Sequence, residues 1–96
     1  MIDFIQEKVP QEELLALLAE EASELAQAAL KLRRVYDGTN LTPVKLGAAI
    51  ANLKEELADV GLIVTVLELD KYQPEIMRIQ REKLKRWVTR LEEVMP

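Results

Sequence analysis

The chain of 96 residues contains neither cysteine nor histidine. Without cysteine it has no disulfide framework, no zinc–thiolate site and no thiol nucleophile. Without histidine it lacks the commonest general base and the commonest transition-metal ligand, and a Ser-His catalytic triad is excluded. Any bound metal must therefore be held by oxygen ligands, which suit Mg²⁺, Mn²⁺ or Ca²⁺.

Aromatic residues are also scarce. They make up only 4% of a chain that is 49% hydrophobic, so the apolar surface is mainly aliphatic. A single domain over residues 1–96 buries only about 60–65% of the surface of its unfolded chain. So much aliphatic surface in so small a domain indicates that part of it is buried between subunits, because oligomerisation is a common remedy for a small core.

The charge and the apolar runs exclude other classes of protein. A net charge of −4 argues against a dedicated binder of nucleic acid polymers, although a local basic cluster could still bind one nucleotide. The longest nearly uncharged run, residues 57–67, is interrupted by Asp59 and is too short to span a bilayer. The first residues, MIDFIQEKV, lack the basic start and apolar run of a signal peptide. We therefore expect a soluble, cytoplasmic protein with no membrane partner.

Proline and glycine residues mark the ends of the expected helices. Pro10 precedes an acidic first turn, Thr42 and Pro43 form an N-cap followed by proline at the first helical position, and Pro74 repeats this pattern. Gly38 suits a left-handed cap at a helix C-terminus. These signals predict helices at about residues 10–36, 43–70 and 74–94, with a short turn of helix over residues 3–8 as a further candidate.

Hydrophobic periodicity supports the three helices. Apolar residues recur in steps of three and four along each, except that Glu21 interrupts the first stripe and Gln80 the third. The stripes comprise Leu14, Leu18, Leu25, Ala28 and Leu32 on the first helix and Ile76, Leu84, Trp87, Leu91 and Met95 on the third. On the second, the stripe comprises Leu46, Ile50, Leu53, Leu57, Val60, Val64 and Leu67. The sequence predicts an all-α fold, a helical bundle of three main antiparallel helices that is completed by oligomerisation.

Four carboxylates fall on or beside these apolar stripes. Glu21 and Glu24 are one turn apart on the first helix, and Glu56 and Asp59 are one turn apart on the second. Asp59 lies inside the apolar run Leu-Ala-Asp-Val-Gly-Leu-Ile-Val, where an isolated charge would cost several kcal/mol unless it were paired or bound to metal.

Antiparallel packing of the two helices would bring the four carboxylates together. Like charges at close range favour protonation, and a hard divalent cation such as Mg²⁺ removes the repulsion. Mn²⁺ is an alternative ion for the same ligands. The competing interpretation is a set of ordinary ion pairs with Lys31, Lys54 or the third helix.

The motifs resemble a known family. Glu20-Glu21-Ala-Ser-Glu24-Leu and, after the loop, Asn52-Leu-Lys-Glu55-Glu56-Leu-Ala-Asp59-Val resemble the ExxE and ExxD motifs of MazG-like nucleoside triphosphate pyrophosphohydrolases, within the all-α NTP pyrophosphatase superfamily. The resemblance covers about residues 11–92 and is closest to the short, single-domain members. Larger members carry a long C-terminal segment, so the site here must be completed by the third helix or by another subunit.

The resemblance implies a function and a site. The chemistry would be Mg²⁺-dependent hydrolysis of nucleoside or deoxynucleoside triphosphates to the monophosphate and pyrophosphate, with Glu21, Glu24, Glu56 and Asp59 as metal ligands. Either Glu20 or Glu24 would position or deprotonate the attacking water. The expected remaining contacts to substrate are Lys31, Lys83 and Arg86 for phosphate, and Asn40, Asn52 and Trp87 for the base.

Two other functions fit the same residues. Three amphipathic helices could form a non-enzymatic oligomerisation or interaction module that binds no divalent metal. A nucleotide sensor could retain the metal site and bind without turnover. For the hydrolase we expect a homo-oligomer, either a dimer or a tetramer.

Overall fold

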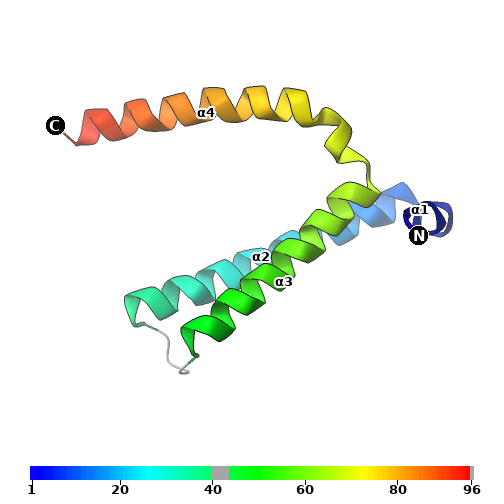
Figure 1. Cartoon of the computed structure of the whole chain (residues 1–96), viewed down its shortest axis with the longest axis horizontal. Helices are drawn as coiled ribbons and strands as arrows, with labels where there is room; N and C mark the ends of the chain where they lie inside the picture. Colours follow the sequence, from blue (N-terminus) through cyan, green and yellow to red (C-terminus); the bar gives the residue numbers. More distant parts are fainter. Residues whose placement is uncertain (40–43, 96) are drawn as a thin grey trace.

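The structure, a computed structural model, describes residues 1–39 and 44–95. This part of the chain is helical almost throughout and contains no strand, which confirms the all-α class (Figure 1). The elements in chain order are α1 (Ile2–Lys8), α2 (Gln11–Asp37), α3 (Leu46–Val66), the short 3₁₀ helix η1 (Leu69–Tyr72) and α4 (Gln73–Val94).

The sequence signals at both ends of α2 have the predicted effect. Pro10 is the N-cap residue in an extended conformation, and it precedes an acidic first turn, where the positive end of the helix dipole favours negative charge. Gly38 ends the helix in the left-handed region, with φ 74°. Thr39 then donates its backbone N–H to the Arg34 carbonyl oxygen at 3.1 Å. The observed helix agrees with the predicted range to within one residue at each end.

The observed ends of α3 differ from the predicted range of 43–70. The expected cap residues Thr42 and Pro43 lie outside the described residues, while Val44 and Lys45 are not helical. The helix also ends at Val66, so the predicted C-terminus was wrong by four residues. Glu68 adopts a left-handed conformation, with φ 58°, that ends the α-helix.

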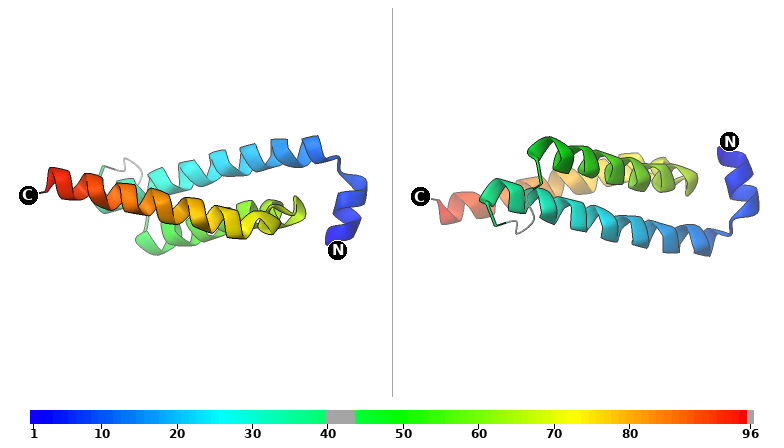
Figure 2. Two further views of the ribbon diagram at one scale, coloured as in Figure 1. Left: turned by 90° about the horizontal axis from the view of Figure 1, so that it is seen from above. Right: turned by 90° about the horizontal axis from the view of Figure 1, so that it is seen from below.

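The two long helices α2 and α3 pack side by side as an antiparallel hairpin (Figures 1 and 2). The tightest part of the core lies at one end, where Leu14, Val66 and Leu67 form a buried cluster. α1 crosses this end, and the partly buried residues packed on the cluster are Ile5, Val9, Leu18, Ile63 and Leu69. The core therefore fixes the end of the hairpin at which the chain enters α2 and leaves α3.

The last helix, α4, does not pack on the hairpin of its own chain. It contacts η1, and within the described residues no extensive contact joins it to α2 or α3 (Figure 1). Pro74 lies in its first turn, as predicted. The apolar stripe expected on this helix is exposed along its whole length, including Leu84 and Trp87.

Within the ranges 1–39 and 44–95, no helix is long and apolar enough to cross a membrane.

Candidate metal centre

Three carboxylates from two helices lie close together in the hairpin. Glu21 and Glu24 project from successive turns of α2, and Glu56 projects from the facing turn of α3. One carboxylate oxygen of each lies within 4.8 Å of an oxygen of the other two. Because residues three apart share a helix face and the two helices are antiparallel, the spacing seen in the sequence becomes a cluster in space. We call these three residues the carboxylate cluster.

Asp59 lies one turn after Glu56 on α3 and is exposed. It is not one of the three residues whose oxygens come within 4.8 Å of one another. Its negative charge nevertheless acts on the cluster, because it raises the pKa values of both Glu21 and Glu56. Asp59 therefore borders the cluster without belonging to it in this conformation.

The cluster contains two carboxylate oxygens that lack a partner. The side chains of Glu21 and Glu56 are partly buried, while Glu24 is exposed. The Oε2 atoms of Glu21 and Glu56 are out of contact with solvent and have no hydrogen-bond partner. Buried polar atoms in folded proteins are nearly always hydrogen-bonded, so these two oxygens are acceptor positions that a cation or a hydrogen-bond donor would fit.

The environment disfavours the charged form of both residues. Withdrawal from solvent raises the pKa of Glu21, and the neighbouring charges of Glu24 and Asp59 raise it further. Burial and the charges of Glu24 and Asp59 raise the pKa of Glu56 in the same way. Between the ordinary glutamate pKa and the raised values, the folded protein holds protons that the unfolded chain has lost. The free energy of unfolding therefore falls as the pH rises through that interval.

No basic side chain neutralises the cluster in the described part of the chain. The two ion pairs found there join Arg33 to Asp37 and Arg78 to Glu82, each between residues four apart on an exposed helix surface. The predicted alternative, in which Lys31, Lys54 or the third helix pairs with these carboxylates, is not observed within one chain.

A hard divalent cation fits these residues. The donors are all carboxylate oxygens, they come from two helices that pack against each other, and the two orphaned Oε2 atoms provide acceptor positions. Mg²⁺ is bound through one or a few carboxylates and keeps several waters, which suits a cluster with one open, solvent-facing member. A cation would also remove the repulsion that raises the two pKa values.

The remaining predicted site residues lie at varying distances along the fold. Glu20 is exposed on α2 beside the cluster, Lys31 is exposed two turns beyond Glu24, and Asn52 is partly buried one turn before Glu56. Asn40 lies outside the described residues.

The predicted residues on α4 are separated from the cluster within one chain. Lys83, Arg86 and Trp87, together with Arg90, line one shallow depression on the exposed surface of this helix. Because α4 makes no extensive contact with the hairpin among the described residues, the fold of one chain does not bring these cations to the carboxylates.

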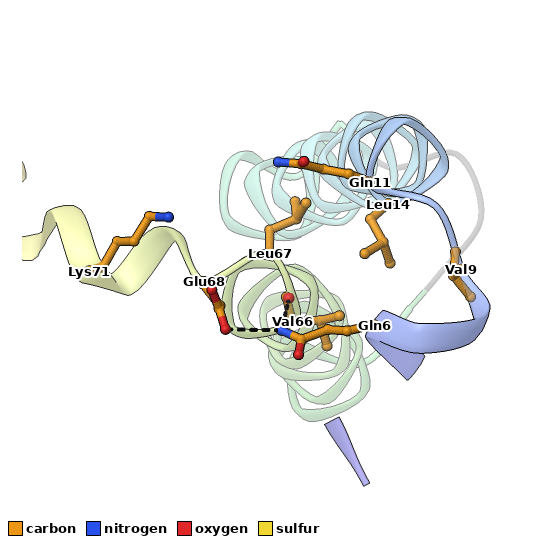
Figure 3. A pocket seen from close by; sticks show the side chains of 8 residues that line it. All are labelled: Gln6, Val9, Gln11, Leu14, Val66, Leu67, Glu68 and Lys71. Carbon is orange, nitrogen blue, oxygen red and sulfur yellow. Dashed lines mark hydrogen bonds between the residues drawn. The ribbon is translucent and has the colours of Figure 1, made fainter. Parts of the chain in front are cut away.

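A second depression, of about 290 Å³, lies at the α1 end of the hairpin (Figure 3). Its walls include the core residues Leu14, Val66 and Leu67, and Gln6 reaches across it. The Gln6 amide donates to the Val66 carbonyl oxygen at 2.8 Å and to Glu68 Oε1 at 3.3 Å. These hydrogen bonds tie α1 to the end of α3, a structural role that no local sequence signal at Gln6 predicts.

Comparison with protein-family models, curated proteins and solved structures finds no significant match to the chain.

Proposed function

We propose that the chain is a Mg²⁺-dependent nucleoside triphosphate pyrophosphohydrolase of the MazG-like type. The observation that carries the proposal is the carboxylate cluster, with its two orphaned Oε2 atoms and raised pKa values. Glu21, Glu24 and Glu56 would hold Mg²⁺ or Mn²⁺, and Asp59 would join them by a change of its exposed side chain. The ExxE and ExxD motifs in the sequence support the same assignment.

The chemistry divides between the cation and the protein. Bound Mg²⁺ supplies charge neutralisation for phosphate oxygens and lowers the pKa of a coordinated water. The exposed carboxylates Glu20 and Glu24 are the available acceptors for the proton of the attacking water. The bond between the α- and β-phosphates breaks, and the products are the nucleoside monophosphate and pyrophosphate.

Basic side chains would bind the remaining phosphate charge. Lys31 is on the same helix as the ExxE motif, whereas Lys83 and Arg86 are on α4 and must reach the site from a different position or a different chain. Asn52 and Trp87 are candidates for contacts to the base, with Asn40 as a third. The proposal includes a cytoplasmic homo-oligomer.

The test is product analysis with matched variants. The purified chain is incubated with a panel of ribo- and deoxyribonucleoside triphosphates and Mg²⁺, and pyrophosphate and orthophosphate are quantified. Glu56→Gln and Asp59→Asn each remove one proposed ligand. Glu55→Gln removes the same charge from an adjacent exposed position and serves as the control.

Pyrophosphate that is released by the unmodified chain and by Glu55→Gln, but not by the other two variants, supports both the reaction and its site. Orthophosphate release would indicate cleavage between the β- and γ-phosphates and would exclude this reaction. Nucleotide binding without turnover would identify a sensor.

A non-enzymatic interaction module is the second candidate. It is favoured by the exposed apolar stripe of α4, which needs a partner but no chemistry. This alternative predicts no turnover, no Mg²⁺ binding and a melting temperature that Mg²⁺ does not change.

A further inference from the structure

α4 is a helix of 22 residues without a partner in its own chain. None of its residues is buried, and all of them lie in the described part of the chain. Leu84 and Trp87 are 58% and 63% exposed, and Val88 and Leu91 are nearly half exposed. A helix in a small protein gains most of its stability from packing an apolar face, so α4 requires a surface that covers this stripe.

The charges of α4 are arranged around that stripe. At 100° per residue, Leu84, Leu91 and Met95 share one line, and basic residues flank it on both sides. The flanking residues are the basic Arg78, Arg81, Lys83, Lys85 and Arg90 and one acidic residue, Glu92. Glu75, Glu82 and Glu93 lie on the opposite face, together with Arg86. The flanks of the stripe therefore carry a net positive charge, which favours an acidic partner surface.

The hairpin presents such a surface. Its two helices carry more acidic than basic residues, and the excess includes the carboxylate cluster and Asp59. In residues 1–39 and 44–95, no ion pair involves the carboxylate cluster or Asp59. Exposed leucines, among them Leu17 on α2 and Leu62 on α3, lie within two turns of the cluster on the same helices. A hairpin that is acidic and partly apolar complements a stripe that is apolar and flanked by basic residues.

The exposed area of the chain is larger than that of a compact monomer of the same mass. A compact monomer of this mass exposes about 5,600 Å², whereas this chain exposes 7957 Å². The radius of gyration is 17.4 Å, against about 12.5 Å for a compact chain of this length. The excess is about 2,300 Å² per chain, or about 4,600 Å² for two chains, and obligate dimers bury about 2,000–5,000 Å² in total. The excess area is therefore what one stable dimer interface requires.

The direction in which α4 leaves the hairpin is fixed by the fold. Leu67 is buried and Leu69 packs on the same core cluster, so the chain is anchored on both sides of the left-handed residue Glu68. Gln6 holds this turn through hydrogen bonds to Val66 and Glu68 (Figure 3). These anchors hold the start of α4 away from its own hairpin, so within one chain α4 does not cover the exposed apolar residues of the hairpin.

We propose that α4 of one copy packs on the α2–α3 hairpin of a second copy, and that the second copy returns its own α4 to the first. The arrangement places Lys83 and Arg90, with Trp87 between them, beside the carboxylate cluster and Asp59 of the other chain. The exchange of α4 needs no catalytic activity, so it can be tested independently of the proposed hydrolysis.

The chain provides its own probe, because Trp87 is the single tryptophan and no cysteine competes with an introduced one. Unmodified chain is equilibrated with an excess of chain that carries Trp87→Phe and a nitroxide at Glu55→Cys, one turn before Asp59. Quenching of tryptophan emission can then arise only between chains. The control places the nitroxide at Ser23→Cys, which is exposed on α2 and points away from Glu21.

The expected result is loss of most Trp87 emission with the label at position 55 and little loss with the label at position 23. Sedimentation of the unmodified chain should show a dimer or a larger even-numbered assembly at the same concentration.

A monomer at that concentration would overturn the proposal. So would equal quenching from the two positions, which indicates no defined docking, or a blue-shifted emission without quenching, which indicates that Trp87 is buried elsewhere. Circular dichroism of each labelled chain checks that it retains the helical fold, and a third labelled position at Leu62→Cys repeats the test on the same helix face.

Discussion

Truncation of Leu84 to alanine is the most quantitative test of helix exchange. Full burial of a leucine side chain contributes about 1.5–3 kcal/mol. Leu84 is 58% exposed in the single chain, so covering it contributes about 1–2 kcal/mol in each chain. A two-fold symmetric pair contains the contact twice. The substitution should therefore destabilise the dimer by about 2–3.5 kcal/mol, which corresponds to a dissociation constant raised about 20- to 300-fold.

The assay is sedimentation equilibrium over a range of concentrations, combined with Trp87 emission on dilution. The matched control is Thr89→Ala, which removes a side chain of similar size from the other side of α4. The control should leave the dissociation constant nearly unchanged. If Leu84→Ala associates as tightly as the unmodified chain, the stripe of α4 is not at the interface and the reasoning is refuted.

Three further predictions concern single residues in α1 and in the hairpin. Without divalent metal, the melting temperature should rise as the pH is lowered from neutral toward the ordinary glutamate pKa, because folding raises the pKa of Glu56. Glu56→Gln should weaken this dependence, and an unchanged slope in thermal melts would contradict the assigned environment. Gln6→Ala removes the hydrogen bond to the Val66 carbonyl oxygen and should lower the free energy of unfolding in urea by about 1 kcal/mol. A decrease smaller than the error of the measurement would mean that this hydrogen bond does not stabilise the contact between α1 and α3. Leu14→Ala leaves a cavity in the core cluster and should cost about 2–5 kcal/mol in the same assay, and a near-neutral effect would mean that this end is not tightly packed.

Much of the hairpin could be predicted from the sequence, because its signals are local. Pro10 and Gly38 define the ends of α2 through backbone geometry that any helix requires at those positions. The spacing of Glu21 and Glu24 fixes them on one helix face before any tertiary structure is known. Their approach to Glu56 follows from antiparallel packing, which a short connection between the helices favours.

The end of α3 could not be predicted in the same way. Glu68 in a left-handed conformation carries no local signal, since glycine or asparagine is the usual residue there. The turn is instead determined by tertiary contacts, namely the burial of Leu67 and Leu69 and the hydrogen bonds from Gln6. Contacts between residues 60 positions apart in the sequence leave no trace in a short window of residues.

The stripe on α4 shows a different limit of sequence reasoning. Periodicity predicts that Leu84, Trp87 and Leu91 need to be covered, but it does not say by which chain. Because α4 lies away from its own hairpin, its own chain does not cover the stripe. The sequence also does not say which chain brings Lys83 and Arg86 to the carboxylates. Their positive charges were expected near the carboxylates, and within one chain they lie on α4, away from them.

Calorimetric titration of Mg²⁺ into the unmodified chain, Glu56→Gln and Glu55→Gln tests the central claim most directly, because it examines the carboxylate cluster itself. We expect saturable binding by the unmodified chain and by Glu55→Gln, and binding that is weaker by more than about tenfold in Glu56→Gln. Mn²⁺ should bind the three proteins with the same order of affinities. Absence of Mg²⁺ and Mn²⁺ binding to the unmodified chain, or equal binding to all three proteins, would contradict a metal centre at Glu21, Glu24 and Glu56.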